Sequence, residues 1–420
     1  MKQVNNICKV PFGFIEIFGN GDVYTCCSAY IYNGCIGNIF KQPFLDIINS
    51  ERAMQIRKNS LENNYSMCNL DLCSPNTMPF ADQLDSKYID NINYNTVLEK
   101  VNVIKFSYDL DCQIRCKSCR DNTIRNSREY IEELDDKARK YFLPIIKYTN
   151  KVCLIGSGDP LASKHTRNFI KMIVEEYPHI KFDLHTNGLL LNEKMLTELN
   201  IIDKLSVIQV SIHSATKETY NKIILDGNFD VLMDNLKYIS NLKNENKIEK
   251  LHLNFVVSNA NLGDAKEFVS LANKFNAKAY FWTVRNSGTE YSIKEANNDL
   301  KLFKIFKDEI FKCPSVYLNP HIFNIIDNDD FIEEYINNQI NELYSQIDLL
   351  TNLINKNELY SQVDLLTNLI NKIVNTLAWW IPVRKWRDNF RNKFFDNFIG
   401  GGVNNGFKFL YPLNFGLNFN

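Results

Sequence analysis

Apolar and polar residues follow two alternating periods through the middle of the chain. Short runs rich in β-branched and aromatic residues, typical of buried strands, are separated by longer stretches with helical spacing. The six predicted strands lie at residues 101–108, 152–155, 180–185, 207–213, 251–257 and 279–284. The predicted helices lie at residues 128–148, 166–177, 193–199, 229–242 and 264–275. Six β/α units in a row predict a parallel sheet covered by outer helices.

The first 80 residues follow a different pattern and hold six of the eleven cysteines. Two apolar runs, at residues 14–18 and 23–27, flank a Gly-Asn-Gly-Asp turn and predict a β-hairpin. This hairpin would bring Cys26 next to Cys8, and the stretch at residues 44–59 is predicted to be helical. The six cysteines are Cys8, Cys26, Cys27, Cys35, Cys68 and Cys73. Two pairs of them brought together by one small fold could form a four-thiolate site.

The last third contains a 16-residue repeat. Residues 341–356 and 357–372 differ only at Ile347, which is Val363 in the second copy. Apolar residues recur at 4-3-4 spacing, as in a coiled coil, and predict a long helix or a helical hairpin used for self-association or packing. Residues 379–394 interleave aromatic side chains with five basic ones. This segment could lie at a membrane surface, bind a partner, or fold back as an amphipathic helix.

Composition narrows the class of protein. With 420 residues, 45% of them hydrophobic and 23% charged, the chain is typical of a soluble protein with two or three domains. A net charge of −1 provides no basic field for nucleic acid. The start lacks the apolar core of a signal peptide, and no run of 18 apolar residues predicts a membrane span. Eleven cysteines without an export signal favour metal or redox use in a reducing cytoplasm over disulfides.

Three further cysteines directly follow the first predicted strand of the central region. Cys112, Cys116 and Cys119 form a C-x3-C-x2-C pattern, which can hold three corners of a small metal cluster and leaves the fourth open. A structural zinc site usually closes with four protein ligands, and no local fourth Cys or His follows. An iron–sulfur cluster with a free iron can instead bind a small molecule. A zinc loop or reduced structural thiols are the alternative.

This cysteine pattern resembles the signature of the radical SAM enzymes. The resemblance implies that Cys112, Cys116 and Cys119 hold a catalytic [4Fe–4S] cluster and that S-adenosylmethionine (SAM) caps its open iron. One electron from the cluster would then cleave SAM to a 5′-deoxyadenosyl radical. The family uses a partial (β/α)6 barrel with its chemistry at the carboxyl ends of the strands. Ser118 stands where the family often has an aromatic residue.

Later loops resemble the motifs with which this family binds SAM. The turn after the second strand is similar to the GGEP motif, whose backbone and acid hold the amino group of SAM. A TNG turn follows the third strand, the fourth ends in a stretch similar to SIDAATKETY, and a turn residue that contacts adenosine in relatives follows the fifth. The residues implied in SAM binding are Gly156, Ser157, Gly158, Asp159, Pro160, Asn187, Ser211 and Asn261.

His213 replaces the aspartate usual in this family. It could touch substrate or relay a proton, because the unperturbed pKa of histidine lies near neutrality. It could equally be a hydrogen-bonded residue in the wall of the site. We therefore treat His213 as a candidate catalytic residue with both roles open.

The N-terminal stretch resembles the SPASM domain, an auxiliary cluster module of many radical SAM enzymes. Here it precedes the catalytic domain instead of following it, and the full set of seven cysteines is absent. The resemblance implies one auxiliary [4Fe–4S] cluster, with Cys27 as an alternative to Cys26 and Cys35 as an ordinary buried thiol. A four-cysteine zinc site is the rival interpretation. The implied ligands are Cys8, Cys26, Cys68 and Cys73.

The predicted fold is thus α/β, a partial (β/α)6 radical SAM barrel with a small N-terminal Cys-rich α+β module and a helical C-terminal extension. The predicted domains are residues 1–95, 96–290, 291–376 and 377–420.

The expected activity is hydrogen-atom abstraction from a small molecule, a peptide or protein, or a surface saccharide, with flavodoxin or ferredoxin as reductant and no nucleic acid partner. We expect a cytoplasmic protein, with peripheral contact at the inner membrane face through residues 379–394 and self-association through residues 341–372. A non-catalytic, zinc- or cluster-stabilised scaffold that recruits partners is the alternative.

Overall fold

The computed structural model divides the chain into two compact units, residues 1–326 and 327–420. The second unit lies outside the described residues, and so do the predicted repeat helix and the aromatic and basic segment. Their proposed roles therefore stay predictions, as do the four domain boundaries. The structure describes residues 7–70, 84, 97–117, 119–155, 158–258, 260–283 and 316–318.

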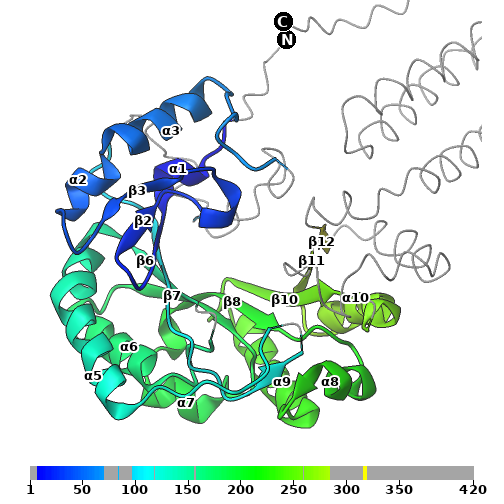
Figure 1. The fold of residues 1–420 in the computed structure, drawn as a ribbon. Coiled ribbons are helices and arrows are strands. Elements are labelled where there is room, and N and C mark those ends of the chain that lie inside the picture. Colours follow the sequence, from blue (N-terminus) through cyan, green and yellow to red (C-terminus); the bar gives the residue numbers. More distant parts are fainter. Residues whose placement is uncertain are drawn as a thin grey trace, which may run out of the picture. The chain divides into compact units, whose positions relative to one another are not determined.

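One sheet of ten strands organises the described residues, in the order β12-β11-β10-β8-β7-β6-β4-β1-β2-β3. Seven consecutive strands of this sheet, from β12 to β4, run parallel to their neighbours (Figure 1). They are β4 (Val103–Ser107), β6 (Lys151–Ile155), β7 (Lys181–Thr186), β8 (Leu205–Ser211), β10 (Lys250–Val257), β11 (Lys278–Thr283) and β12 (Val316–Leu318).

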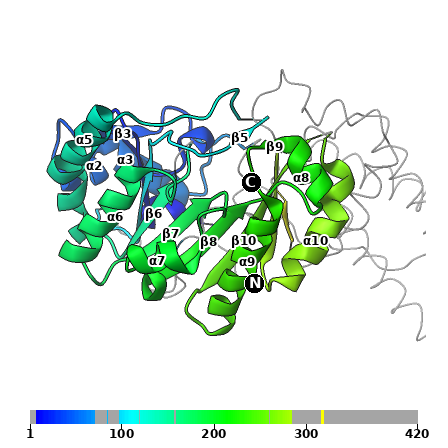
Figure 2. The same cartoon turned by 90° about the horizontal axis from the view of Figure 1, so that it is seen from below.

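Helices in the connections cover the outside of this sheet, as Figure 2 shows from below. They are α5 (Arg128–Lys137), α6 (Lys164–Glu176), α7 (Glu193–Glu198), α8 (Lys217–Ile223), α9 (Phe229–Asn244) and α10 (Ala265–Lys274). The alternation of parallel strands and outer helices confirms the predicted partial α/β barrel.

Several elements differ from the sequence prediction in their extent, and for two of them the backbone shows the reason. The helix predicted over residues 128–148 is α-helical only to Lys137 and continues as π-helix η3 (Ala138–Phe142) and 3₁₀-helix η4 (Leu143–Tyr148). Pro144 lies in the first turn of η4 and has no N–H to continue α-helical bonding. Strand β8 ends at Ser211, because His213 has a φ of +61° and cannot extend a strand.

The N-terminal module contains the predicted hairpin and a third strand that the sequence pattern did not predict. Gly21 adopts a φ of +86° in the turn of the hairpin, a conformation that glycine accepts without strain. The elements are α1 (Val10–Gly13), β1 (Phe14–Ile17), β2 (Asp22–Tyr24), η1 (Ser28–Tyr30), β3 (Cys35–Asn38), α2 (Phe44–Ile48) and α3 (Glu51–Leu61).

Strand β1 joins this module to the barrel. It pairs in parallel with β4, so that Phe14 lies beside Val103 and Glu16 lies beside Lys105. The module therefore extends the sheet of the barrel at its first strand. Because the two strands are parallel, the turn that follows β1 lies at the same edge of the sheet as the loops that follow the barrel strands.

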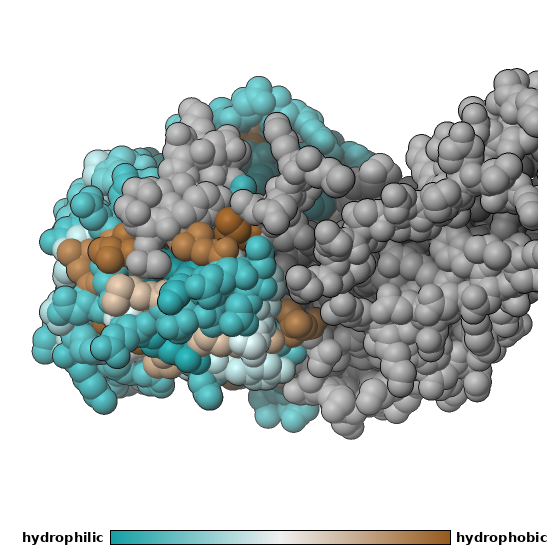
Figure 3. All heavy atoms as spheres, turned by 90° about the horizontal axis from the view of Figure 1, so that it is seen from above, coloured by the Kyte–Doolittle hydropathy of each residue, from teal (hydrophilic) through white to brown (hydrophobic). Residues whose placement is uncertain are grey.

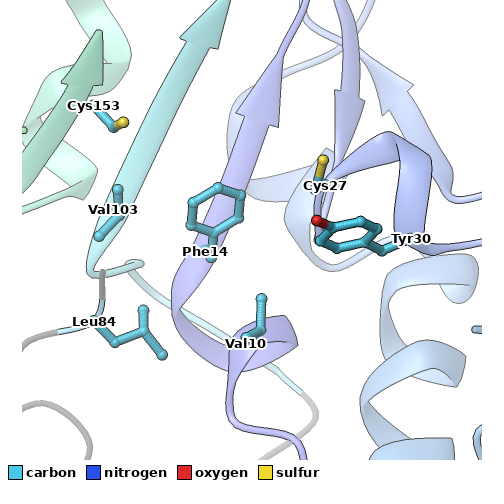
Figure 4. Close-up of a cluster of buried hydrophobic side chains, with 7 residues drawn as sticks. All are labelled: Val10, Phe14, Cys27, Tyr30, Leu84, Val103 and Cys153. Atoms are coloured by element: carbon cyan, nitrogen blue, oxygen red, sulfur yellow. The ribbon is translucent and has the colours of Figure 1, made fainter. Parts of the chain in front are cut away.

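A hydrophobic core is shared between module and barrel (Figure 4). Burial of each large apolar side chain contributes roughly 1.5–3 kcal/mol to stability, so a shared core stabilises the docking of the module. The module contributes Val10, Phe14, Cys27 and Tyr30, which pack against Leu84, Val103 and Cys153.

A buried ion pair crosses the same junction. Lys105 Nζ lies 2.7 Å from Glu16 Oε1, and the two side chains are only 6% and 3% exposed. The other bonds of this carboxylate come from the Ser107 hydroxyl at 2.8 Å and the Ser28 backbone N–H at 3.0 Å. Burial works against both charges, but the attraction of Glu16 outweighs it and raises the pKa of Lys105 to about 12. The same attraction lowers the pKa of Glu16 against the effect of burial.

The face drawn in Figure 3 is mostly hydrophilic where residues are described, with hydrophobic residues gathered in a few short patches. Leu110, close to the first cysteine of the C-x3-C-x2-C pattern, is 47% exposed. Within the described ranges, every helix is too short or too polar to cross a membrane.

Candidate active site

The segment after β4 that carries Cys112, Cys116 and Cys119 is called the cysteine loop here. Two buried aspartates fix its entrance. Asp109 accepts hydrogen bonds from the hydroxyls of Ser163 and Thr166, at the start of α6. Asp111 accepts from Arg125 Nη1 at 2.9 Å and from the Asn126 backbone N–H at 3.2 Å. The loop therefore leaves β4 in a fixed direction, because its first two carboxylates are tied to the segments that follow it.

The middle of the loop is clamped onto the segment after β8. Strand β5 (Arg115–Cys116) pairs antiparallel with β9 (Ile224–Leu225). Arg115 also forms a two-pronged ion pair with Asp226, with Nε 2.7 Å from Oδ2 and Nη2 3.2 Å from Oδ1. Bidentate geometry fixes orientation as well as distance. Cys116 is thereby held against a second loop at the carboxyl edge of the sheet.

The three thiols of the loop lie within electrostatic range of one another. Burial, together with the neighbouring Cys119 and Cys112 thiolates, raises the pKa of Cys116 to about 12. Burial also raises the pKa of Cys112, which is 7% exposed. Arg120 lies beside the third thiol, with Nη2 3.5 Å from Cys119 Sγ. Buried thiols with raised pKa values are weak nucleophiles but become thiolates on binding metal.

The turn after β6 is bonded directly to the cysteine loop. Gly158 N–H donates to Asp109 O at 3.0 Å, and Asp159 N–H donates to Asp111 O at 2.7 Å. A Cβ on Gly158 would lie 2.2 Å from Asp111 O. Only glycine allows this approach, which explains its place in the motif. Gly156 and Ser157 lie outside the described residues, and Pro160 is buried.

We expect Gly158→Ala to destabilise the protein by about 1–3 kcal/mol, because the backbone must move to admit the methyl group. Urea denaturation of the full chain measures the free energy of unfolding. The variant should also bind less iron, since the same backbone carbonyl belongs to the cysteine loop. Unchanged stability and unchanged iron content would show that the two loops do not depend on this contact.

Asp159 is 3% exposed and uses its carboxylate within the protein. Oδ1 accepts from the N–H groups of Leu161 and Ala162, at 3.0 and 3.1 Å. Oδ2 accepts from the Thr186 hydroxyl and the Asn187 N–H, both at 2.7 Å. Burial raises the pKa of Asp159 in spite of these bonds. Asp159 thus joins the turn after β6 to the turn after β7, and its predicted contact with the amino group of SAM stays a prediction.

Asn187 extends the turn after β7 toward the cysteines. Its side-chain amide exchanges two hydrogen bonds with that of Gln113, at 3.0 and 3.2 Å. Asn187 Nδ2 also lies 3.9 Å from Cys112 Sγ. Gly188 follows with a φ of +82°, the conformation expected of an Asn-Gly turn. The three loops after β4, β6 and β7 therefore form one bonded unit around Cys112.

The remaining predicted residues lie after β8 and β10. Ser211 ends β8, is partly buried, and its hydroxyl has no hydrogen-bond partner in the described part of the chain. Asn261 is 2% exposed, and its amide bonds only to the protein, accepting from Ser258 and donating to the carbonyls of His213 and Val256. Asn261 therefore fixes the shape of two loops, and its predicted contact with adenosine stays a prediction.

His213 is held as a neutral side chain. Its Nδ1 accepts a hydrogen bond from the Val256 backbone N–H at 3.0 Å, which places the ring proton on Nε2. Burial lowers the pKa of His213 to about 4. This shift is away from the near-neutral pKa on which a proton relay depends, and both roles of His213 stay predictions. His213 can donate from Nε2 to a ligand, and it is also the hydrogen-bonded wall residue of the second interpretation.

The structure brings three of the four predicted auxiliary ligands into one region. Cys8 and Cys68 lie within electrostatic range, and burial first, then the charge of Cys68, raises the pKa of Cys8 to about 12. Cys8 and Cys26 both pack against the core shared by module and barrel, and both are partly buried. Cys73 lies outside the described residues. The three described thiols come from the chain before α1, the chain after β2 and the chain after α3.

Two other cysteines of the module are distinguished by burial. Cys27 is 4% exposed inside the shared core, which favours Cys26 as the ligand. The expectation that Cys35 is buried is wrong, because Cys35 is exposed at the start of β3. Strand β3 is the last strand of the sheet, and an edge strand leaves side chains open to solvent.

Several residues that shape the site were not predicted. The most important are Asp109, Gln113 and the pair Arg115–Asp226, because each fixes a segment next to a thiol. Asp109 could have been noticed as a polar residue directly after a buried strand. The partners of Gln113 and Arg115 lie far away in the sequence and leave no local signal.

Comparison with known proteins identifies two regions. Residues 110–272 match the family model of the radical SAM superfamily. Residues 8–74 match that of SPASM, an iron–sulfur cluster-binding domain.

The curated relatives include two FeMo cofactor biosynthesis proteins NifB. The protein from Methanocaldococcus jannaschii is 31% identical over 127 residues, and the one from Methanocaldococcus infernus is 30% identical over 127 residues. Each match covers 27% of this chain and 40% of the relative, so the chain spans about 40% of the length of these curated relatives.

Solved structures with a similar course of the chain include HydG, a maturase of the [FeFe]-hydrogenase, and methylornithine synthase (PylB). HydG is 13% identical with a TM-score of 0.32, over 52% of this chain and 51% of HydG. PylB is 13% identical with a TM-score of 0.29, over 49% of this chain and 64% of PylB.

Proposed function

The chain belongs to the radical SAM superfamily and carries a SPASM-like cluster-binding module, and from this premise we propose that it modifies a peptide, a protein or a saccharide by hydrogen-atom abstraction. When bound, a [4Fe–4S] cluster and the SAM on its open iron supply the 5′-deoxyadenosyl radical. The family match favours an enzyme over the scaffold alternative. The role in the name of NifB belongs to those relatives, of which this chain spans about 40%.

The donor set of the site fits such a cluster. Cys112, Cys116 and Cys119 lie on one loop and share electrostatic range, and this convergence is the observation that carries the proposal. Within the described ranges, no three His, Cys, Asp or Glu side chains are close enough to hold a single metal ion. A four-iron cluster binds each thiolate to a different iron, and its ligands stand farther apart than those of one ion.

The side chains of the site have the following roles in the proposed reaction. The three thiolates ligate the cluster, and Arg120 holds Cys119 through its guanidinium. The Ser211 hydroxyl can bind SAM, because no described residue occupies it. The loops joined by Asp159 hold the backbone of the Gly-rich turn at the cysteine loop. His213 can donate a hydrogen bond from Nε2 to a ligand, since Nδ1 already accepts from Val256 N–H, and its catalytic role is a proposal.

The N-terminal module is proposed to hold an auxiliary [4Fe–4S] cluster through Cys8, Cys26, Cys68 and Cys73. We expect Cys68→Ala to lose about four irons per chain, while dithionite-driven cleavage of SAM continues at the separate catalytic site. Iron and sulfide analysis and 5′-deoxyadenosine production measure the two effects. Loss of zinc with unchanged iron in this variant would support the zinc interpretation of the module instead.

Flavodoxin or ferredoxin is the proposed electron donor, since a radical SAM enzyme needs an external reductant. A cytoplasmic location is also a proposal. Residues 379–394 are proposed to contact the inner membrane face, and residues 341–372 are proposed to mediate self-association. Both segments lie outside the described residues.

Anaerobic reconstitution of the full chain tests the proposed function. About eight irons and eight sulfides per chain are expected from two four-iron clusters, with 5′-deoxyadenosine formed from SAM and dithionite. A protein that takes up zinc alone, or that carries iron but never cleaves SAM, would overturn the proposal and favour the scaffold.

A further inference from the structure

The N-terminal hairpin and the first barrel loop enclose a cleft of about 480 Å³. This volume lies in the range of roughly 300–1,000 Å³ that small-molecule sites occupy. One wall comes from the module and the other from the barrel, so the cleft exists only because β1 docks on β4. Its lining includes Phe18, Asp22, Tyr24 and Ser28 from the module and Ser107 and Leu110 from the barrel.

The cleft opens at the catalytic edge of the sheet. The turn after β1 lies at the carboxyl edge because β1 and β4 are parallel, and it packs closely there, since a Cβ on Gly19 would lie 3.0 Å from Tyr108 Cβ. Leu110 lines the cleft two residues before Cys112, the first predicted ligand of the catalytic cluster. A ligand in this cleft therefore lies beside the entrance of the cysteine loop.

The register of the strands places the cleft on the inner face of the sheet. Phe106 packs against Phe142 and Phe169 of the outer helical layer, so the alternate residue Lys105 faces inward. Glu16 pairs with Lys105, and Tyr24 pairs with Glu16, so these side chains share that inner face.

Glu16 forms hydrogen bonds to both walls of the cleft. One carboxylate oxygen accepts from the Ser107 hydroxyl of the barrel, and the other accepts from the Ser28 N–H of the module. The buried Lys105 balances its charge. The walls are thus preorganised, and little binding energy is needed to order them around a ligand.

The polar side chains that line the cleft favour a ligand that donates hydrogen bonds and disfavour an anionic ligand. Asp22 bonds only to the neutral amides of Asn20 and Asn38, at 2.7 and 2.9 Å, and no described cation pairs with it. The hydroxyls of Tyr24 and Ser28 have no hydrogen-bond partner in the described part of the chain. No described lysine or arginine lines the cleft. A carboxylate among hydroxyls suits an amine with neighbouring hydroxyl groups.

Two aromatic rings complete the site. The rings of Phe18 and Tyr24 meet edge to face, with centroids 5.4 Å apart and planes at 78°. This pair offers a rigid apolar surface beside the polar groups. A compact ring that carries hydroxyls on its edge and C–H groups on its face matches both surfaces better than an extended peptide does.

We propose that this cleft is the substrate site and that it binds an amino sugar, with the amine at Asp22 and ring hydroxyls at Tyr24 and Ser28. The assignment rests on the proposed function and selects the saccharide among its substrate classes. Asp22 is the specificity-determining group, because it is the charged group of the cleft that has no cationic partner among the described residues.

Saturation-transfer NMR with the full, reconstituted chain tests this assignment, with D-glucosamine, D-glucose, D-glucose 6-phosphate and a lysyl tripeptide as probes. D-Glucosamine should bind, D-glucose should bind more weakly, and the phosphate should not bind. Asp22→Asn should weaken D-glucosamine about tenfold, the loss of one charge-assisted hydrogen bond. Tyr24→Phe should weaken both neutral and amino sugars. Asp46→Asn, an exposed acid of the same module, is the matched control and should change nothing.

Equal binding of D-glucosamine by the wild type and by Asp22→Asn overturns the assignment, and so does binding of the tripeptide in place of the sugar. The SAM cleavage assay is separate from this measurement. If the wild type cleaves SAM but binds no amino sugar, the cleft assignment fails and the proposed function stands. If it binds the sugar through Asp22 but never cleaves SAM, the enzymatic function fails and the cleft stands as a binding site.

Discussion

Cys116→Ala is expected to bind about four fewer irons per chain than the wild type and to form no 5′-deoxyadenosine from SAM. Cys116 lies in the middle of the cysteine loop, where β5 pairs with β9, and its thiol is in electrostatic range of both other candidate ligands. A cluster that loses one of three protein ligands cannot keep its open iron in place. Anaerobic reconstitution followed by iron, sulfide and 5′-deoxyadenosine analysis measures both effects.

Cys35→Ala is the matched control, because Cys35 is exposed on edge strand β3 and belongs to neither proposed ligand set. This variant should retain the iron content and the SAM cleavage of the wild type. If Cys116→Ala keeps its iron and its cleavage activity, the catalytic assignment is wrong. If Cys35→Ala loses iron as well, the auxiliary ligand set must be revised.

The barrel and the position of its candidate site could be predicted because both leave patterns within short stretches of the sequence. The strand and helix periods are visible within windows of about ten residues, and the candidate loops directly follow the predicted strands. The cysteine loop, the Gly158 turn and the Asn187 turn accordingly meet at one edge of the sheet, as the strand order requires.

The docking of the N-terminal module and the ion pair that holds the cysteine loop could not be predicted in the same way. The hydrogen bond from Ser107 to Glu16 spans 91 residues, and the ion pair of Arg115 with Asp226 spans 111. Neither pairing leaves a periodic signal in the sequence. Glu16 and Lys105 lie within apolar runs, where a charged residue suggests an exposed face, but each neutralises the other inside the fold.

His213 shows a second limit of prediction from the sequence. Its residue type suggests a group that titrates near neutral pH, but the backbone N–H of Val256 occupies Nδ1 and burial lowers its pKa to about 4. The hydrogen bond comes from β10, 43 residues away in the chain. The protonation state of a histidine therefore depends on the packing of the strand beside it and cannot be inferred from its motif alone.

The second large effect is expected at the junction of module and barrel. Glu16→Gln should destabilise the protein by about 3–5 kcal/mol, because it leaves the Lys105 ammonium buried without a counter-charge. Urea denaturation of the full chain measures this loss. The double variant Glu16→Gln with Lys105→Met removes both charges and should recover most of it. Equal losses in the single and double variants would show that packing, and not the ion pair, carries the stability.

The pH dependence of the same pair gives an independent test. The folded pKa of Glu16 is below its ordinary value of 4.5, so its contribution is fully present above pH 4.5 and is lost as the pH falls through the folded pKa. The folded pKa of Lys105 is about 12 against an ordinary 10.5, so its contribution is present below pH 10.5 and is lost as the pH rises toward 12. Between pH 4.5 and 10.5, the difference in unfolding free energy between the wild type and the double variant should therefore be constant. It should shrink beyond both ends of this range, below pH 4.5 and above pH 10.5, and a difference that varies across neutral pH would show that the titrating group is not this ion pair.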